Sequence, residues 1–560
     1  MAVSSRIHIP WEDTNSSLPP ASPALPHGLT INPFPYAVTA ILVLAVIISV
    51  HVQYLSSNNG RRKIPILNPR RPFELTTTRT RHEYDLHSWD MMYQGIRKYP
   101  DQAFRVLSEE LGNIVVLPPR YATEFKNDER FSFSSIVAKS FHGNLPGFGT
   151  FNVFSQPNKI VQTIVQKDIT RAIPKLTGPF SRETDRALRE TITDSTDWHD
   201  VVVKNTVFGL VTRLSTLAFM GADMCHDPEW IDVTVHFAVQ AFLSAKAVST
   251  WPSWLQPFAN LYLIPRCRDL RALEAKARGI IHAELEKRQR LKAEAEKNNV
   301  ELEFHDVLEW SQRYSNLGEA FDPTLVQLGV SFVAIHTSTD LLTQVVLDLA
   351  EHQELLEPLR KEITDCLSRG GGLNKASLHS MMLLDSVIKE SQRLKPAQVG
   401  EYPLTYIPQP PALTVLPGMM EREVLEDVTL SDGLHLKRGS SILVAPPLRD
   451  ASIYENPEEY DGYRFYRIRQ QPGQKNTAQL VTTSLADMAF GYGQHTCPGR
   501  FFAVYELKIA LCHLLLKYDW KLAEGAGKPH WVAHGNNLDS DGQARIVIRR
   551  REVGEAEGLL

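Results

Sequence analysis

One cysteine in the last part of the chain stands in a setting suited to binding a metal. Cys497 follows a glycine-rich stretch that begins at Phe490, and it precedes Pro498, Gly499 and an apolar run that predicts a helix. Glycine allows tight turns and lets the backbone approach a flat ligand closely. A thiolate at the beginning of a helix is stabilised by free backbone N–H groups and by the helix dipole. The segment therefore predicts a single sulfur ligand to iron.

A second motif pairs a carboxylate with a guanidinium group. Glu390 and Arg393 lie in a predicted helix from Leu378 to Leu394 and share one face of it, because residues i and i+3 are neighbours on a helix. The two side chains can form charge-assisted hydrogen bonds and jointly hold a third partner. A lone pair of this kind is usually solvated and contributes little, so we expect a structural role only if that third partner is present.

Taken in order, these motifs resemble those of the cytochrome P450 family. The segment from Phe490 to Gly499 is similar to the haem-binding loop F-x-x-G-x-H-x-C-x-G. Glu390 to Arg393 is similar to E-x-x-R, and Asp461 to Phe465 to P-x-R-F. The resemblance implies a mainly α fold with small β-sheets, in one large haem domain of the P450 fold. It also implies haem b as cofactor, with Cys497 as the axial ligand of the haem iron.

The resemblance assigns further residues to the haem pocket. His495 and Arg422 are expected to donate to the haem propionates, which are anions and need donors. Phe490 is expected to shield the sulfur. The residues assigned to the cofactor site are Cys497, His495, Arg422, Phe490, Gly491 and Gly493, with Glu390, Arg393 and Arg464 holding the pocket together. The tryptophan-x-x-x-arginine donor of the family is not evident around residues 158–162.

A long helix from about residue 323 to 349 is predicted to cross the centre of the domain. Asp322 and Pro323 form an N-cap and first-turn signal, and apolar residues then occupy nearly every face. By position the helix resembles the P450 helix that crosses the haem. Two later segments predict small sheets: a hairpin over residues 428–436, with its turn at 431–433, and a strand over 546–548.

The oxygen-activation motif of this helix departs from the family pattern A/G-G-x-D/E-T. The matching stretch, from Ala334 to Thr339, reads Ala-Ile-His-Thr-Ser-Thr. In this alignment Thr337 replaces the acid and Ser338 takes the place of the threonine. We predict that the Ser338 hydroxyl, or that of Thr339, passes protons to bound dioxygen, and Thr337 is counted as a third catalytic candidate. A cavity-facing or satisfied histidine is the favoured interpretation of His336, with proton donation as the alternative. The predicted pocket residues are Val330, Val333, Ala334, Ala397 and Val399.

The beginning of the chain predicts a membrane anchor. Tyr36 to Leu55 carries no charge and is long enough to span the hydrocarbon core. Basic residues between Arg61 and Arg71 follow it, which places the bulk of the chain in the cytosol. We therefore expect a lumenal tail over 1–35, an anchor over 36–55, a basic hinge with prolines over 56–75, the haem domain over 76–550 and a short tail over 551–560. The resemblance implies single-pass attachment to the endoplasmic reticulum membrane.

Composition and motifs limit which partners and which cellular compartment the sequence predicts. With 60 basic and 64 acidic residues the net charge is −4, so no overall field favours nucleic acid. The five cysteines show no paired spacing, which argues against a disulfide framework and suits reducing cytosol. No G-x-G-x-x-G loop stands between a strand and a helix. Electrons are therefore expected from a separate protein. The P450 resemblance implies NADPH–cytochrome P450 reductase as that donor, with cytochrome b5 as an optional second donor.

These features predict a haem-thiolate monooxygenase that oxidises a hydrophobic small molecule with dioxygen. The Ala-Ile-His-Thr variant resembles P450 enzymes of filamentous-fungal secondary metabolism, of the ent-kaurene oxidase type. That resemblance implies a terpenoid, indole-diterpenoid or polyketide-peptide substrate. Two alternatives stay open: a haem-thiolate isomerase or dehydratase that needs no dioxygen, and a haem sensor.

A proline-rich segment separates the E-x-x-R helix from the strand that carries Arg422. Residues 400–417 contain five prolines and no helical period, whereas P450 chains pass almost directly from helix to strand. One interpretation is a surface insertion, which a loop tolerates at a small entropic cost. We favour a retained intron, because Gly-Glu-Tyr at 400–402 can be encoded with a fungal donor site. Its removal would join Val399 to Gly418 and restore the family spacing.

Overall fold

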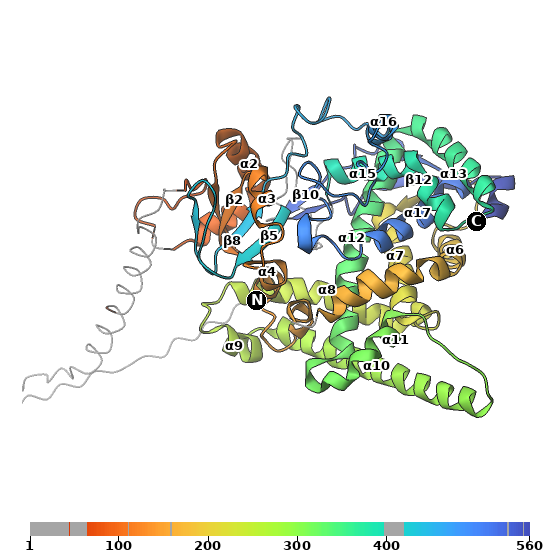
Figure 1. The fold of residues 1–560 in the computed structure, drawn as a ribbon, viewed down its shortest axis with the longest axis horizontal. Coiled ribbons are helices and arrows are strands. Elements are labelled where there is room, and N and C mark those ends of the chain that lie inside the picture. Colours follow the sequence, from red (N-terminus) through yellow and green to blue (C-terminus); the bar gives the residue numbers. More distant parts are fainter. Residues whose placement is uncertain are drawn as a thin grey trace, which may run out of the picture. The chain divides into compact units, whose positions relative to one another are not determined.

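The computed structural model describes residues 64–396 and 419–560, apart from 75, 110, 157–158, 535–536 and 553, together with Leu44. The predicted anchor, apart from Leu44, and the segment 397–418 lie outside the described residues. Within residues 64–560 the chain folds as one mainly helical domain with small sheets, as predicted (Figure 1).

Helices make up most of the domain. Their bounds are α2 Thr78–Lys98, α3 Ala122–Phe125, α4 Phe133–Ser140, α5 Ile160–Thr163, α6 Thr170–Thr191, α7 Val203–Met220, α8 Pro228–Ser249, α9 Gln256–Phe258, α10 Pro265–Lys297, α11 Val307–Ser311, α12 Pro323–Glu351, α13 Leu356–Gly370, α14 Lys375–Ser380, α15 Met382–Leu394, α16 Arg464–Gln470 and α17 Arg500–Lys517. The helix predicted over 378–394 is thus two helices. They are separated at Met381, whose extended backbone (ψ 87°) interrupts the helical path.

The largest sheet brings distant parts of the chain together. Its strand order is β1-β2-β8-β5-β3, and β2 pairs with β8 in parallel while the other pairs are antiparallel. The strands are β1 Phe104–Ser108, β2 Gly112–Leu117, β3 Phe131–Ser132, β5 Met419–Val424 and β8 Ser441–Val444. In Figure 1 this sheet lies beside α2, α3 and α4. Strand β5 carries Arg422, so the sheet fixes where that guanidinium lies.

Three smaller sheets complete the domain. One has the order β4-β12-β9, from His199–Val202, Arg545–Arg550 and Tyr518–Leu522. The predicted hairpin is present as β6 Val428–Thr429 and β7 His435–Leu436, and Gly433 in its turn has a φ of 86° that favours glycine. The predicted strand over 546–548 lies within β12. A last hairpin pairs β10 Val532–His534 with β11 Asn537–Asp539.

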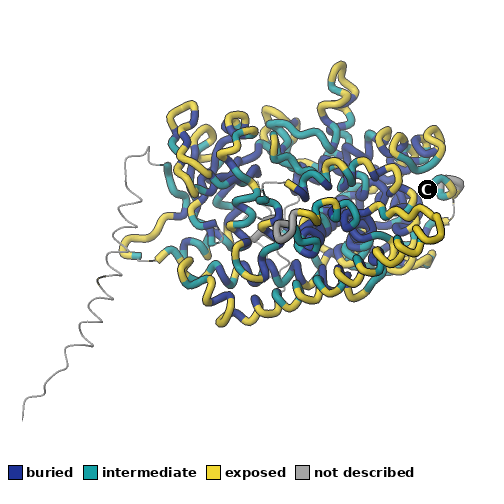
Figure 2. The backbone as a smooth tube through the Cα atoms, turned by 60° about the horizontal axis from the view of Figure 1, so that its bottom comes forward, coloured by how far each residue is buried: buried dark blue, intermediate teal, exposed yellow. Residues whose placement is uncertain are grey.

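Helix α12 runs through the centre of the domain, as predicted. The Asp322 carboxylate caps it by accepting from Thr324 N (2.9 Å) and Leu325 N (3.4 Å), and Pro323 fits the first turn. Phe332 on α12 packs among Phe141, Phe151 and Phe242, with ring centroids 4.9 to 5.5 Å from its own. Figure 2 shows buried residues in dark blue in the interior and exposed residues in yellow at the surface.

Two described helices, α8 and α12, are long and apolar enough to cross a membrane. In α12, 83% of the apolar window is buried inside the fold, and in α8 50% is buried. Core helices of soluble domains pass the same test of length and composition, so these two helices are weak evidence for a membrane span.

Candidate active site

The cysteine loop is closed by its own backbone. Cys497 N donates to Phe490 O (2.7 Å), and Gly491 N donates to Met488 O (2.7 Å). Gly491 and Gly493 have φ values of 76° and 81°, which strain any other residue. A Cβ at Gly493 would lie 2.3 Å from Lys126 O, so only glycine lets the loop rest on the segment after α3.

Cys497 stands just before α17, where free backbone N–H groups point toward its sulfur. Burial raises the pKa of the thiol, whereas the N–H groups of Gly499 and Arg500 and the Arg500 guanidinium lower it. Among the five free cysteines, all in the described part, Cys497 alone is not fully buried. The other four thiols are buried, and burial raises the pKa of each. Charged groups lie beside two of them: Glu183 and His226 beside Cys225, and Arg369 beside Cys366. Cys497 is the cysteine in the glycine-rich loop, where two backbone N–H groups donate toward its sulfur, and a metal ion bound there would complete the stabilisation of the thiolate.

Three cationic or polar groups gather beside this loop. Arg422 on β5 is 2% exposed. Its Nη1 donates to Glu421 O (2.7 Å), while Nε and Nη2 have no partner among the described residues. Burial lowers the pKa of Arg422 to about 10. Burial, followed by the charges of Arg422 and Lys159, lowers the pKa of His495 to about 4. Donors buried without acceptors are unfavourable, so an anionic ligand fits here.

Lys159 was missed by the sequence analysis. It lies in the stretch where the tryptophan-x-x-x-arginine donor was sought, and it immediately precedes α5 with a left-handed φ of 48°. Lys159 is a lysine where the family has an arginine, and the tryptophan is missing, so the family motif cannot be recognised in the sequence. The available signal was a positively charged residue within the stretch where a propionate donor was expected.

One face of α12 is open although the helix is otherwise largely buried. Val333 is 36% exposed, and Ala334 and Thr337 are half-buried. These positions share one face, because residues three and four apart are neighbours on a helix. Thr337 Oγ1 donates to Val333 O (2.8 Å), which leaves its lone pairs available on the open side. Val330, the third predicted pocket residue on this helix, is buried in the core at 2% exposure. Ala397 and Val399 lie outside the described residues.

The hydroxyl on the open face therefore differs from the expected one. Ser338 is buried and donates to the carboxyl of Glu506, and Thr339 is fully buried. The reason is helical geometry, since one residue turns the side chain by about 100°. Moving the alignment by one position puts Ala334 at the second small residue of the family pattern, His336 at the acid and Thr337 at the threonine. In this second alignment Thr337 stands where the family pattern has its threonine, and it is half-buried whereas Ser338 and Thr339 are buried.

Glu506 on α17 is a second residue that the sequence analysis missed. It is fully buried, and burial raises its pKa to about 8, against the opposing effect of hydrogen bonds from Ser215 (2.8 Å) and Ser338. Its carboxyl is therefore largely neutral near pH 7. It is the only acidic residue in the apolar run from Phe501 to Leu516, which was the available signal.

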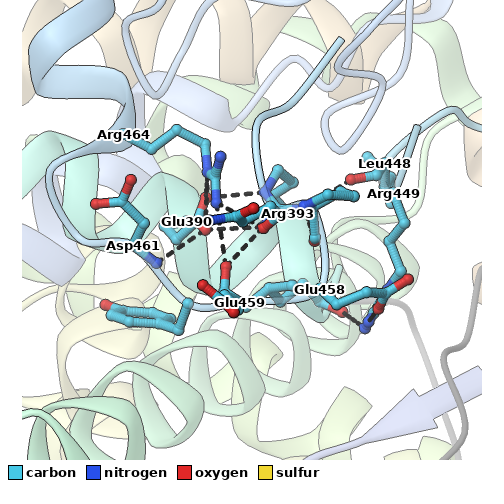
Figure 3. Close-up of polar contacts among 12 residues, drawn as sticks. Glu390, Arg393, Leu448, Arg449, Glu458, Glu459, Asp461 and Arg464 are labelled. Atoms are coloured by element: carbon cyan, nitrogen blue, oxygen red, sulfur yellow. Dashed lines mark hydrogen bonds and ion pairs between the residues drawn. The ribbon is translucent and has the colours of Figure 1, made fainter. Parts of the chain in front are cut away.

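The structure brings the predicted charged triad together (Figure 3). Arg393 donates from Nε and Nη2 to the two Glu390 oxygens (2.8 and 2.7 Å), and Arg464 Nε donates to both (3.0 and 3.1 Å). The Glu390 side chain is fully buried, and both guanidinium groups are buried. Such a network is stable only when its remaining donors find acceptors.

Those acceptors are backbone carbonyls of the loops that precede α16. Arg393 Nη1 donates to Leu448 O (2.7 Å) and Pro457 O (2.8 Å), and Arg464 Nη2 donates to Glu459 O (3.1 Å). Asp461 N donates to Glu390 Oε1 (3.1 Å). The triad thus ties α15 to the irregular segment 448–461 that leads toward the cysteine loop. It has no contact with Cys497 itself, which agrees with a structural role.

Comparison with known proteins agrees with this geometry. Residues 85–402 and 413–533 match the cytochrome P450 family. The chain belongs to the cytochrome P450 family. It is 38% identical over 521 residues to cytochrome P450 monooxygenase hepE of Aspergillus oryzae, covering 92% of this chain and 91% of the relative. It is also 37% identical to cytochrome P450 monooxygenase esdpI of Penicillium shearii, covering 88% and 92%.

Solved structures share the P450 fold. The haem domain of cytochrome P450DA superposes with a TM-score of 0.62 at 15% identity, covering 87% of this chain and 98% of that one. The retinoic-acid-bound cyanobacterial CYP120A1 superposes with a TM-score of 0.58 at 17% identity, covering 84% and 96%. The family match leaves out residues 403–412, which lie inside the segment 400–417 singled out in the sequence.

P450 enzymes are haem-iron enzymes, and the residues of this chain fit that cofactor. Cys497 provides a sulfur at a helix N-terminus, and Gly493 provides the close backbone approach. The unpartnered Nε and Nη2 of Arg422, with His495 and Lys159 nearby, fit the anionic propionates. The resemblance predicted from the sequence is thereby confirmed at the level of family and cofactor.

The triad makes a direct prediction. Glu390→Gln leaves two guanidinium groups buried without their anion, at a cost of about 3–5 kcal/mol. We expect most of the purified variant to lack haem and to unfold at a lower temperature, measured by the haem-to-protein ratio and by thermal unfolding. In the matched control Glu357→Gln, an ion pair of the same i, i+3 spacing is lost from a carboxylate that is 75% exposed. That change should alter stability by less than about 1 kcal/mol. Normal haem content in Glu390→Gln would contradict the role given to the triad.

Proposed function

We propose that this protein is a membrane-anchored haem-thiolate monooxygenase that oxidises a hydrophobic small molecule in fungal secondary metabolism. The observation that carries the proposal is the Cys497 sulfur, held by N–H groups at the start of α17 beside a cationic cluster with unsatisfied donors. Haem, when bound there, supplies the iron that activates dioxygen. The residues of the protein do the remaining work: they hold the haem, position the substrate and deliver protons.

The chain's own residues divide that work. Phe490 O accepts from Cys497 N and so fixes the backbone of Cys497, and the Phe490 side chain packs against the main hydrophobic core. Arg422 and Lys159 would offset the charge of the propionates, and the neutral imidazole of His495 would donate a hydrogen bond to them. Thr337 Oγ1, on the open face of α12, is the group that we assign to holding a water and passing its proton. Val333 and Ala334 border the same face and contact the substrate.

The relatives support the substrate class in broad terms only. They are fungal proteins named as P450 monooxygenases, and several belong to Aspergillus, Penicillium and Fusarium. With the Ala-Ile-His-Thr sequence at 334–337, this favours a terpenoid, indole-diterpenoid or polyketide-peptide substrate. We further propose that NADPH–cytochrome P450 reductase delivers the electrons, with cytochrome b5 as a second donor. The unmatched residues 403–412 support the interpretation of 400–417 as a retained intron.

Membrane attachment is supported by two separate features. The uncharged segment 36–55 can span a bilayer by its length. In the haem domain, the turn before α9, together with α9 and the π-helix η6 (Ala259–Leu263), exposes a row of large apolar side chains. These are Trp254 (79% exposed), Phe258, Leu261, Tyr262 (72%) and Leu263. Trp and Tyr favour the membrane interface, so we propose that this patch rests on the endoplasmic reticulum membrane from the cytosolic side.

A replacement of Cys497 tests the chemistry. Cys497→Ala should abolish the ferrous–carbon monoxide absorption band that gives the family its name, whereas Cys366→Ala should keep it. In the producing fungus, Cys497→Ala should lead to accumulation of a precursor that lacks one oxygen atom or carries two more hydrogens than the normal product, measured by mass spectrometry. A precursor with the composition of the product, or of the product plus water, would instead indicate an isomerase or dehydratase. An unchanged metabolite profile would favour a haem sensor.

A pair of single substitutions on α12 tests which hydroxyl serves the proton path. Thr337→Ala should keep haem and NADPH consumption, while product formed per NADPH falls by about 10²-fold and hydrogen peroxide rises, because a positioned proton relay is lost. Ser338→Ala should keep that yield and lose about 1 kcal/mol of stability, since only a buried hydrogen bond to Glu506 is removed. The measurement is product and peroxide per NADPH, with the accumulated precursor as substrate. The reverse pattern would return the role to Ser338.

Sequential changes test the two membrane contacts. The full chain should stay with the membrane pellet after an alkaline carbonate wash. Deleting residues 36–55 should leave a protein that is released by carbonate but still pellets in dilute salt. Adding Trp254→Ser and Tyr262→Ser to that deletion should release it into the supernatant, because the remaining apolar contact is removed. A deletion protein that is already soluble in dilute salt would contradict the proposed role of the patch.

A further inference from the structure

Outside the candidate active site, one group of side chains carries the atoms that bind zinc in proteins. Among the residues that the structure describes, Glu183, Cys225 and His226 form the one group of three whose carboxylate, sulfur and imidazole atoms all lie within 4.8 Å of one another. Glu183 lies in α6, whereas Cys225 and His226 end the short helix η5 (Met224–His226). A set of sulfur, nitrogen and oxygen ligands favours zinc over magnesium and calcium, which bind through oxygen.

The turn between α7 and α8 holds Cys225 and His226 in place. Helix α7 ends at Met220, and Gly221 follows with a φ of 87°, which favours glycine. Cys225 N donates to Gly221 O (3.3 Å). On the other side, the Asp227 carboxylate caps α8 by accepting from the backbone N–H groups of residues 229 and 230. Both sides of the turn are therefore anchored, and the two side chains stand between two helix ends.

The distances fit a metal ion with one open side. His226 Nε2 lies 3.0 Å from Glu183 Oε2. Two such ligand atoms, each about 2.0–2.1 Å from a tetrahedral zinc, are about 3.3 Å apart. Cys225 is 1% and Glu183 7% exposed, so sulfur and carboxylate come from the interior. The His226 side chain is 29% exposed, which leaves a fourth position to water.

The carboxyl of Glu183 has an oxygen that nothing uses. Its Oε1 is buried and has no hydrogen-bond partner among the described residues. Arg213 Nη1 stands 3.5 Å from this oxygen and is itself buried without a hydrogen bond. A buried carboxylate with so few partners is unfavourable. A dication beside it removes that penalty, because one thiolate and one carboxylate together neutralise Zn²⁺.

Two arginines beside the group would repel a metal ion if their charges were free, but another carboxylate holds both. Glu190 accepts from Arg186 Nε (2.9 Å) and forms an ion pair with Arg213 Nη2 (2.5 Å). Arg186 Nη1 also lies 3.2 Å from His226 Nε2, the atom expected to bind the metal. The Arg186 side chain is 58% exposed, so it can turn this nitrogen into solvent at little cost.

Helix α6 also packs against α17, the helix that follows Cys497. Ser181, two residues before Glu183, hydrogen-bonds with His513 Nε2 on α17 (2.9 Å). The ring of Phe180 lies 6.0 Å from that of Phe502 on α17. A metal ion on Glu183 therefore stabilises the layer of helices on which α17 rests.

We propose that Glu183, Cys225 and His226 form an exchangeable zinc site that ties α6 to the turn between α7 and α8. Three protein ligands and an open position distinguish it from closed structural sites with four protein ligands. On binding, the Cys225 thiol loses its proton to solvent, because the thiolate is the zinc ligand. No electrons are transferred, and the site does not depend on the monooxygenase function proposed above.

Zinc itself is the probe. The full, haem-loaded chain without a histidine tag is freed of other metals by a chelator and dialysed against Zn²⁺ or, in parallel, Mg²⁺. We expect one zinc per chain by elemental analysis and a zinc X-ray absorption spectrum with one sulfur at about 2.3 Å. The temperature of thermal unfolding should rise with zinc, because a ligand that binds only the folded state stabilises it. Mg²⁺ should have none of these effects.

Single substitutions identify the ligands. Cys225→Ser keeps the size of the side chain and should lower zinc affinity by at least about 100-fold, since even residues that only hold a metal ligand in place contribute about 10- to 100-fold. The sulfur signal should disappear with it. The matched control Cys366→Ser, which alters another buried thiol beside an arginine, should leave zinc binding unchanged. If Cys225→Ser lowers the haem content, His226→Gln takes its place, because that side chain is partly exposed, with the same expected loss of affinity.

The outcomes are distinguishable. Zinc bound through nitrogen and oxygen alone, with the same affinity in Cys225→Ser, would be adventitious binding at the surface and would overturn the proposal, as would the absence of binding. The ferrous–carbon monoxide band of each sample shows that the Cys497 sulfur is occupied by haem iron and is not the zinc ligand. Absence of that band in the unmodified protein would contradict the monooxygenase function and not the zinc site, which Cys225→Ser still tests.

Discussion

The site depends on one buried carboxylate, that of Glu390. It accepts from two guanidinium groups at 2.7 to 3.1 Å and is completely excluded from water. Burying these charges is unfavourable unless every donor is used, and the spare donors of Arg393 and Arg464 reach carbonyls between residues 448 and 459. That segment has little regular structure of its own. The triad gives it one conformation and so fixes the path of the chain toward Cys497.

The cysteine loop is held by backbone hydrogen bonds together with a few side chains: Asn127 Oδ1 accepts from Gln494 N (3.0 Å), and Arg500 Nη1 donates to Cys497 O (3.0 Å). Its hydrogen bonds from Cys497 N to Phe490 O and from Gly491 N to Met488 O involve no side chain, and Gly493 rests directly on Lys126 O. A loop built in this way can present sulfur, N–H groups and a flat surface in one place. The cationic cluster at its side comes from elsewhere: Arg422 from a strand of the largest sheet and Lys159 from the start of α5. The haem site is therefore assembled from parts far apart in the chain.

Helix α12 shows how environment separates chemically similar groups. Glu506 and Asp340 are both buried carboxyl groups next to this helix, yet burial without a cation raises the pKa of Glu506 to about 8, while two lysines lower the pKa of Asp340. Two hydroxyls are separated in the same way. Thr337 lies on the open face, and Ser338 is taken up by a buried hydrogen bond. One residue of helical rotation separates the hydroxyl on the open face from the buried one.

The sequence by itself determined the family, the cysteine proposed as the haem ligand, the Glu390–Arg393 pair of the charged triad and the central helix with its Asp322 cap. These follow from local rules: glycine in a tight loop, i and i+3 on one helix face, and a capping carboxylate before proline. The tertiary structure decided which hydroxyl of residues 337–339 faces the open side. The sequence could not, because the stretch 334–339 lacks the acid of the family pattern and can be aligned with that pattern in two registers. It also decided the environments of Lys159, Glu506 and Asp340. Their roles depend on partners hundreds of residues away, such as Ser215 for Glu506 and Ser540 for Asp340. Burial and long-range pairing set the charge of such groups, and no spacing along the chain encodes either.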